Sequence, residues 1–144
     1  MSVLSTLRIA GSALTAQRLR MDVTSSNIAN VETTSTPQGG PYRRSQVAFA
    51  PLQATFDPRR TGQAQATSSG VYVRSITQDD APARRSYQPT HPDADPDGYV
   101  AMPNVDLVTE MADMLSASRA YEANITTINV AKNMAQRALD IGRV

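Results

Sequence analysis

The placement of proline constrains this chain more than any other feature of its sequence. All nine prolines and five of the seven glycines lie between residues 37 and 103. Proline breaks a helix and glycine weakens one, so long helices are disfavoured in this middle part and permitted on both sides of it. The chain is therefore predicted to form a helix, a turn-rich insert and a second helix.

The amino-terminal part carries an apolar repeat with a helical period. Leucine, methionine or isoleucine recurs at every seventh position, with further positions near the half-steps, which is a helical seam and not the alternation of a strand. We expect a helix from about Val3 to about Asn30. Its seam comprises Leu4, Leu7, Gly11, Leu14, Met21, Ile28 and Val31.

The carboxy-terminal part repeats this design. Pro103 and Asn104 indicate a helix start, with Asn104 as the predicted cap and Asp106 in the first turn, where the helix dipole favours negative charge. Gly142 is the predicted stop. The predicted stripe, apolar except at Ser118 and Lys132, comprises Leu107, Met111, Met114, Ser118, Tyr121, Ile125, Ile128, Lys132, Ala135 and Leu139.

The insert contains short segments of alternating pattern. These predict strands at Tyr42 to Phe49 and at Val71 to Ile76, and the stretch from Asp57 to Gly70 is typical of a flexible loop. The acidic turn from Asp93 to Gly98 is expected to lead into a short strand at Tyr99.

These elements predict a mainly α fold with a small β-rich insert. The two long terminal helices are expected to pair as a coiled coil that flanks a short middle domain. The predicted divisions are residues 1–36, 37–103 and 104–144. Helices draw most of their stability from packing, so a lone pair would be poorly ordered, and small residues such as Ala10 and Ala120 would let neighbouring helices approach. An intramolecular helical bundle with an insert is the alternative.

Composition excludes several classes of function. The formal net charge of +1 arises from near balance, which argues against general attraction to nucleic acid or anionic lipid. The three arginine pairs (Arg43 with Arg44, Arg59 with Arg60, Arg84 with Arg85) are expected to be solvated surface. Cysteine is absent, so disulfides and thiolate metal sites are excluded.

Neither a membrane helix nor a secretory signal is indicated. No apolar run approaches the ~18 residues that a span needs, and arginines interrupt the apolar pattern at the start of the chain. The sequence predicts a soluble cytosolic protein, unless an export system that cleaves no signal handles it.

No catalytic, cofactor or metal site is expected. The segment from Asp93 to Gly98 fits the first half of a calcium loop, but the twelfth position is Asn104 where a bidentate glutamate is needed. His91 is the only histidine, and no nucleophile elbow or phosphate-cradling glycine loop accompanies it. An enzyme is therefore not predicted.

Two segments carry a resemblance to a known family. SNIANVETT (residues 26–34) resembles the amino-terminal signature of bacterial flagellar axial proteins. NVDLVTEMADMLSASRAYEANITTINVAKNMAQRALDIGR (residues 104–143) is similar to their carboxy-terminal helix, most recognisably over residues 119–124. PYRR (residues 41–44), HPDADPDGYVAMPNV (residues 91–105) and the short middle resemble the basal-body rod members, and Glu32 departs from the asparagine that many of these carry.

The resemblance implies a structural subunit of the proximal rod, the drive shaft that crosses the periplasm around the export channel and transmits torque. Such subunits are exported unfolded by the flagellar type III apparatus without signal cleavage, and their terminal helices pair into an inner tube while the insert forms an outer domain. The implied partners are copies of itself, other rod proteins, membrane-ring proteins and export-apparatus proteins. Another rod or hook component is one alternative, and an arginine-pair nucleic-acid adaptor is a second.

Asn27 and Asn30, one turn apart at the end of the first predicted helix, are the least expected residues in that helix because asparagine competes for backbone hydrogen bonds. One hypothesis is that their amides cap exposed backbone groups or bond a neighbouring subunit, and the other is that both cap their own helix. The predicted assembly interface comprises Leu7, Gly11, Leu14, Met21, Asn27, Ile28, Asn30, Val31, Met111, Met114, Ser118, Arg119, Tyr121, Asn124, Ile125, Ile128, Ala135 and Leu139.

Overall fold

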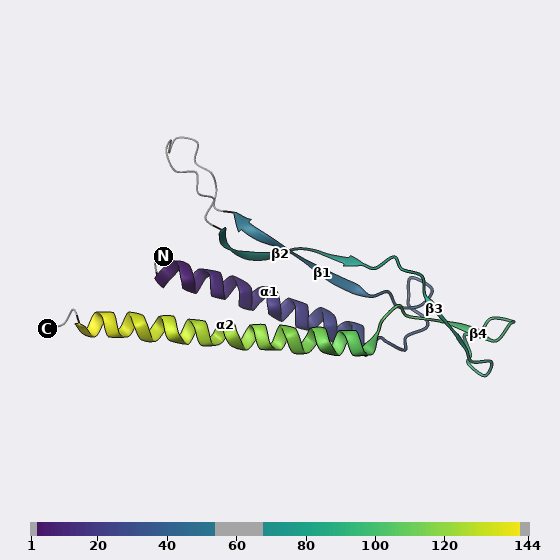
Figure 1. Cartoon of the computed structure of the whole chain (residues 1–144). Helices are drawn as coiled ribbons and strands as arrows, with labels where there is room; N and C mark the ends of the chain where they lie inside the picture. The colour runs from purple at the N-terminus through teal and green to yellow at the C-terminus, as the bar shows by residue number, and fades with distance from the viewer. Residues whose placement is uncertain (1–2, 54–67, 142–144) are drawn as a thin grey trace, which may run out of the picture. The chain divides into compact units, whose positions relative to one another are not determined.

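The computed structural model describes residues 3–53 and 68–141, which form two helices and four strands (Figure 1). The helices are α1 (Val3–Ala29) and α2 (Leu107–Ile141). The strands are β1 (Ser45–Gln53), β2 (Ser68–Gln78), β3 (Arg84–Tyr87) and β4 (Tyr99–Met102). The predicted order of helix, β-rich insert and helix is confirmed.

The insert contains two separate two-stranded sheets, β1 with β2 and β3 with β4. In the second sheet the strands are antiparallel, and the register pairs Arg84 with Met102 and Tyr87 with Tyr99. The short strand at Tyr99 was predicted. The partner strand β3 was not, because its sequence RRSY has no apolar alternation.

Two further predictions, the flexible loop and the end of the second helix, involve residues outside the described part of the chain. Of the predicted loop from Asp57 to Gly70, only Ser68 to Gly70 is described, and these residues begin β2. Gly142, the predicted stop of the second helix, lies outside the described residues.

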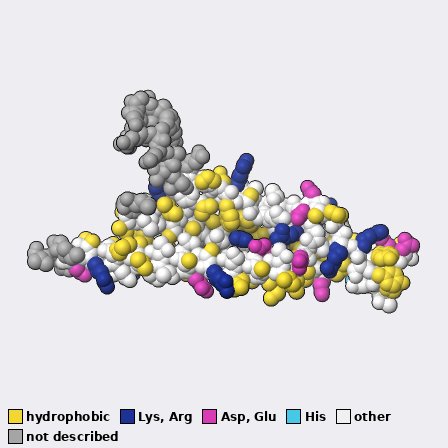
Figure 2. Space-filling view, in the orientation of Figure 1, with side chains coloured by type: hydrophobic (Ala, Val, Ile, Leu, Met, Phe, Trp, Pro, Cys, Tyr) yellow, Lys and Arg dark blue, Asp and Glu magenta, His cyan; other side chains and the backbone are white. Residues whose placement is uncertain are grey.

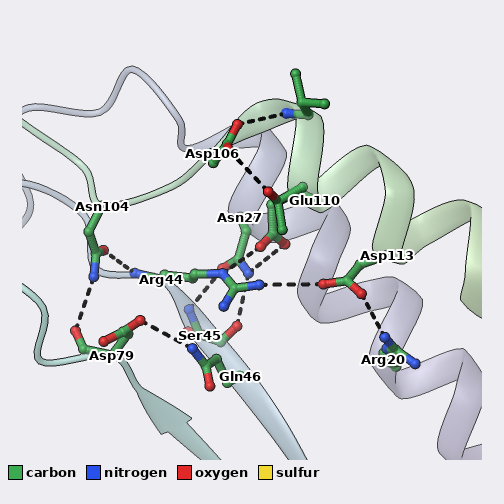
Figure 3. Close-up of polar contacts among 12 residues, drawn as sticks. Arg20, Asn27, Arg44, Ser45, Gln46, Asp79, Asn104, Asp106, Glu110 and Asp113 are labelled. Carbon is green, nitrogen blue, oxygen red and sulfur yellow. Dashed lines mark hydrogen bonds and ion pairs between the residues drawn. The ribbon is translucent and has the colours of Figure 1, made fainter.

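Asp106 caps α2, so the prediction that Asn104 is the cap was wrong. The Asp106 backbone carbonyl accepts the first helical bond from the Glu110 N–H at 2.9 Å, and its side-chain Oδ1 accepts from the Val108 N–H at 3.0 Å (Figure 3). The Asn104 amide is engaged elsewhere, because its Oδ1 accepts from the Arg44 N–H at 2.9 Å and its Nδ2 donates to the Asp79 carbonyl at 3.3 Å.

The chain divides into two compact units. The first comprises residues 1–19, 49–74 and 117–144, and the second comprises residues 20–48 and 75–116, so each helix contributes one part to each unit. The predicted division at residues 36 and 103 stays a prediction.

Small side chains make the buried part of the first unit. Its buried apolar residues in the described chain are all alanines, namely Ala10, Ala16, Ala117 and Ala131. Strand β2 approaches α1 closely at Gly70, which is buried and has a φ of +141°, and a Cβ there would overlap Ser12 Oγ. The next residue, Val71, donates its N–H to Ser12 Oγ at 3.1 Å. Among the described residues of this unit, the fully buried apolar positions are therefore small, and β2 lies close to α1 at Gly70.

The second unit combines a short apolar core with buried polar groups. Val100 of β4 and Val105 are its buried apolar residues together with Pro103, whereas Thr24, Asn27 and Glu110 are buried and polar. Beside this core, the rings of Tyr87 and Tyr99 meet edge to face at 5.3 Å. The buried polar residues are the ones that require a physical account, because burying them is unfavourable unless their hydrogen bonds are made.

Candidate assembly site

Asn27 connects α1 to the start of β1 and to α2 within the second unit. Its Nδ2 donates to the Ser45 carbonyl and to Glu110 Oε2, and its Oδ1 accepts from the Ser45 N–H and the Tyr42 hydroxyl, each at 2.9 Å. These four bonds use the full capacity of a side-chain amide. The amide binds both backbone groups of Ser45, as a neighbouring strand would, and it is only 1% exposed.

Arg44 and two carboxylates extend this cluster (Figure 3). Arg44 Nε lies 2.5 Å from Glu110 Oε1, and its Nη2 lies 3.4 Å from Asp113 Oδ2. Arg20 of α1 pairs with the other oxygen of Asp113 at 2.8 Å. We call the five residues Arg20, Asn27, Arg44, Glu110 and Asp113 the clasp.

The charges of the clasp balance, since two arginines face two carboxylates. Glu110 is the critical member because its side chain is 1% exposed and each of its oxygens has a partner, Arg44 on one and Asn27 on the other. A buried ion pair is tolerated only when its geometry and hydrogen bonds are complete, and removing one partner is strongly destabilising. The clasp is thus suited to holding α1, α2 and β1 in one arrangement.

The clasp offers no arrangement suited to catalysis or metal binding. Its polar atoms are committed to one another, and nothing in it pairs a nucleophile with a base. Across residues 3–53 and 68–141, no cluster of three or more histidine, aspartate or glutamate side chains is placed to hold a metal ion. Within the same residues, neither helix combines the length and apolarity that a membrane span requires.

Asn27 and Asn30 have different roles, although they lie one turn apart. Asn30 donates its Nδ2 to the Ser26 carbonyl at 2.8 Å, so it caps the end of its own helix, as the second hypothesis had it. Asn27 instead bonds residues of other elements of its own chain. Contact of either residue with another subunit stays a prediction.

Except for Asn27, which is buried, the predicted interface residues lie beside the most buried face of each helix and not on it. On α1 and just after it, the predicted seam residues are partly exposed, apart from Leu4, which is 79% exposed. On α2, Met111, Arg119, Ile125 and Leu139 are exposed. The partly exposed set on α2 comprises Met114, Ser118, Tyr121, Asn124, Ile128 and Ala135. The fully buried positions are Ala10, Ala16, Thr24, Asn27, Glu110, Ala117 and Ala131, which are small or polar.

Sequence reasoning missed four members of the clasp. Arg44 was expected to be solvated, and this was wrong, since its side chain is 23% exposed and paired with two carboxylates. The neighbouring Arg43 is solvated as predicted, since its side chain is 57% exposed and pairs with the still more exposed Asp80. A signal was present in α2, because Glu110, Asp113 and Ala117 follow the three-four spacing of one helix face.

Comparison with protein families identifies the class of protein. The family described as "Flagella basal body rod protein" matches residues 7–35, and the family described as "Flagellar basal body rod FlgEFG protein C-terminal" matches residues 97–141. The two matches cover the ends of the chain in the expected order. They define an axial protein of the bacterial flagellum of the rod type, as the resemblance predicted.

Whole-chain relatives narrow the class further. The chain is 49% identical to the flagellar basal-body rod protein FlgC of Borreliella burgdorferi over 98% of both chains. It is 43% identical to FlgC of Bacillus subtilis and 44% identical to FlgC of Salmonella typhimurium, over 99% of this chain and 100% of each relative. The chain belongs to the FlgC family of flagellar basal-body rod proteins.

Membership of this family makes the chain a structural subunit of the flagellar rod, and its part in motility follows. The relatives are structural rod proteins and not enzymes. The alternative of a nucleic-acid adaptor is not favoured. Arg43, Arg44 and Arg85 each have a carboxylate partner, which leaves these members of the arginine pairs engaged within the chain.

Proposed function

We propose that the subunit polymerises through α1 and α2, which pair as a coiled coil around the export channel, while the β-rich insert forms the outer part. The assembled rod crosses the periplasm and transmits torque through many shared helix contacts. Its neighbours are further copies, other rod proteins, membrane-ring proteins and proteins of the export apparatus. The chain reaches the rod by flagellar export without cleavage of a signal.

One observation carries this proposal: in the described part of the chain, large apolar side chains of α2 are exposed. In the second unit, Val108, Met111 and Leu115 are 75%, 59% and 54% exposed. Their three-four spacing places them on one face of the helix. Contiguous exposed apolar surface of this kind marks interaction sites in soluble proteins.

The first unit supports the same proposal. Its described core of alanines provides little apolar burial, whereas Val130, Met134 and Leu139 of α2 are at least half exposed. The surface view shows hydrophobic side chains at many places on the visible face (Figure 2). Neighbouring helices in a polymer would remove these side chains from water, which is worth ~25 cal/mol per Å² of apolar area.

Heterologous contacts between such helices explain how a rod could form. A head-to-tail interface that does not close on itself produces a helical polymer. Arg119, Tyr121 and Asn124 lie on α2 among the predicted contact residues, and Asn124 already donates to the Ala120 carbonyl at 2.7 Å within the helix. We assign these residues to the contact surface as part of the proposal.

The test places a charge on the exposed stripe. Met111→Asp and Leu115→Asp are introduced separately into a strain that lacks the chromosomal gene, and swimming and basal-body rods are examined. Ser116→Asp is the matched control, because Ser116 is exposed on the same helix but is not apolar. Far-ultraviolet circular dichroism of each purified chain reports helix content.

We expect Met111→Asp and Leu115→Asp to abolish swimming and rod completion while helix content stays that of the parent, and Ser116→Asp to swim normally. Normal rods in both stripe variants would remove this surface from the assembly interface.

The route of export has a separate readout. Mass spectrometry of the chain extracted from basal bodies should recover its original amino terminus, and a shortened chain would contradict export without cleavage.

A further inference from the structure

We infer that the clasp fixes the register and the rotation of α2 against α1 in the second unit, and so turns the apolar stripe of α2 outward. The first part concerns the single chain alone. The second part, that this orientation serves assembly, rests on the proposed function.

The register argument follows from the burial of Glu110. Apolar contact is non-directional, so apolar burial by itself would tolerate a slip of one helix along the other. A slip of one turn moves a side chain by ~5.4 Å along the helix axis. That displacement would remove Glu110 from both Arg44 and Asn27, which lie 2.5 and 2.9 Å from its oxygens, and would leave a buried carboxylate unpaired. Only one register keeps these contacts.

The rotation argument follows from helix geometry. With 3.6 residues per turn, Met111, Leu115 and Val108 lie about 100°, 140° and 160° from Glu110 around the helix axis. They therefore point away from the side on which Glu110 is held. These are the residues of the exposed stripe, so turning Glu110 toward Arg44 and Asn27 also fixes where the stripe faces.

The insert supplies the fixed side of the clasp. The Arg44 N–H donates to Asn104 Oδ1 at 2.9 Å, and the Arg44 carbonyl accepts from the Asp79 N–H at 2.8 Å. The next residue, Ser45, has both backbone groups bound by Asn27. Because the backbone around Arg44 is bonded on both sides, its guanidinium is presented from a constrained position. Arg44 is thus a positioning residue that acts on the helix pair from the insert.

The absence of cysteine allows a direct test on the full chain. Ser25 of α1 and Ser116 of α2 are exposed in the second unit, and cysteine at each accepts a spin label. Pulsed electron–electron double resonance then measures the distance between the two labels. We expect a single narrow distance distribution in the parent. In Arg44→Met we expect a broadened distribution, with a second component displaced by ~5 Å, the length of one helical turn.

Arg43→Met is the matched control. Arg43 precedes Arg44 and also forms an ion pair, with Asp80 at 3.0 Å, but both partners are exposed. This variant should keep the narrow parental distribution. Broadening of equal size in Arg43→Met would overturn the assignment to the clasp.

A second variant covers the case in which Arg44→Met does not fold. Arg44→Met combined with Glu110→Leu removes both charges, and replacing a buried pair by apolar residues is often neutral or stabilising. We expect this double variant to retain its helix content and still to show a broadened distribution. A narrow parental distribution in the folded double variant would overturn the register role.

The link to assembly has its own readout. The same double variant, without labels, is expected to lose swimming and rod completion in the strain that lacks the gene. Normal rods together with broadened distances would overturn the link to assembly and leave the register role standing. Met111→Asp and Leu115→Asp do not alter the clasp, so failure of the proposed function is recognised separately from failure of this inference.

Discussion

Replacement of Asn27 by alanine tests the physical basis of the second unit most directly. The substitution removes four hydrogen bonds of 2.9 Å, one of them to the Glu110 carboxylate. A neutral hydrogen bond contributes about 1 kcal/mol net, and one to a charged group about 2 kcal/mol. Water can reach the partly exposed Ser45 and Tyr42 and restore part of the loss. We therefore expect the free energy of unfolding to fall by about 3 to 5 kcal/mol.

Asn30→Ala is the control for this prediction. Asn30 is the same residue type one turn later, but its side chain makes only local hydrogen bonds within the described residues. Its amide donates to the Ser26 carbonyl, and its Oδ1 accepts from the Thr33 hydroxyl. Its loss should cost no more than about 1 kcal/mol. The contrast between the two asparagines isolates the effect of burial and of partners on other elements.

The assay is urea unfolding of the full chain followed by circular dichroism. With a slope of about 1 to 3 kcal/mol per molar urea for a small protein, Asn27→Ala should lower the midpoint by more than 1 M, and Asn30→Ala by much less. Equal midpoints for the two variants, or a loss below about 0.5 kcal/mol for Asn27→Ala, would refute the argument that the buried amide holds α1 to β1 and α2.

Three further predictions concern local geometry. Gly70→Ala should lower the melting temperature, since the new Cβ overlaps Ser12 Oγ and the φ of +141° is unfavourable for alanine. Gly11→Ala should raise the melting temperature. Apart from its chain neighbours and the nearby backbone of its own helix, nothing lies within 4 Å of the new Cβ, and alanine favours a helix by about 1 kcal/mol. The opposite order of the two variants would contradict the close approach at Gly70. Hydrogen bonds from the Thr109 hydroxyl and, secondly, from the Val108 N–H lower the pKa of the Asp106 carboxyl. The ionised carboxyl should therefore stabilise the fold fully above its ordinary pKa of about 3.9. This stabilisation should be lost as the pH falls through the lowered pKa of the folded protein. Asp106→Ala should thus melt below the parent at neutral pH and approach it in acid, and a difference that grows in acid would contradict this sign.

The sequence was sufficient to predict both helices because their signals are local. The proline-free ends and the seven-residue repeat predict a helix to about Asn30, and α1 ends at Ala29. Strands β1 and β2 overlap the predicted alternating segments. Strand β3 had no such signal. It forms by pairing with β4, its only described sheet partner, and the sequence of neither strand by itself predicts that pairing.

The cap of α2 shows where local rules end. Asn104 and Asp106 are both good cap residues, so propensity alone does not choose between them. Asn104 is excluded because its amide bridges Arg44 and the Asp79 carbonyl, residues 60 and 25 positions away in sequence. Asp106 remains, and the helix begins at Leu107.

By itself the sequence determined the order of elements, the periodicity of both helices and the signatures of the flagellar rod family, since each depends on residues close together along the chain. Only the tertiary structure decided that alanine, asparagine and glutamate, and not the leucine and methionine seam, occupy the buried faces. The physical reason is that burial depends on which distant groups complete a hydrogen bond or a charge pair. Arg44 forms an ion pair with Glu110 although the two residues are 66 positions apart in sequence, and no local pattern around either residue predicts this pair.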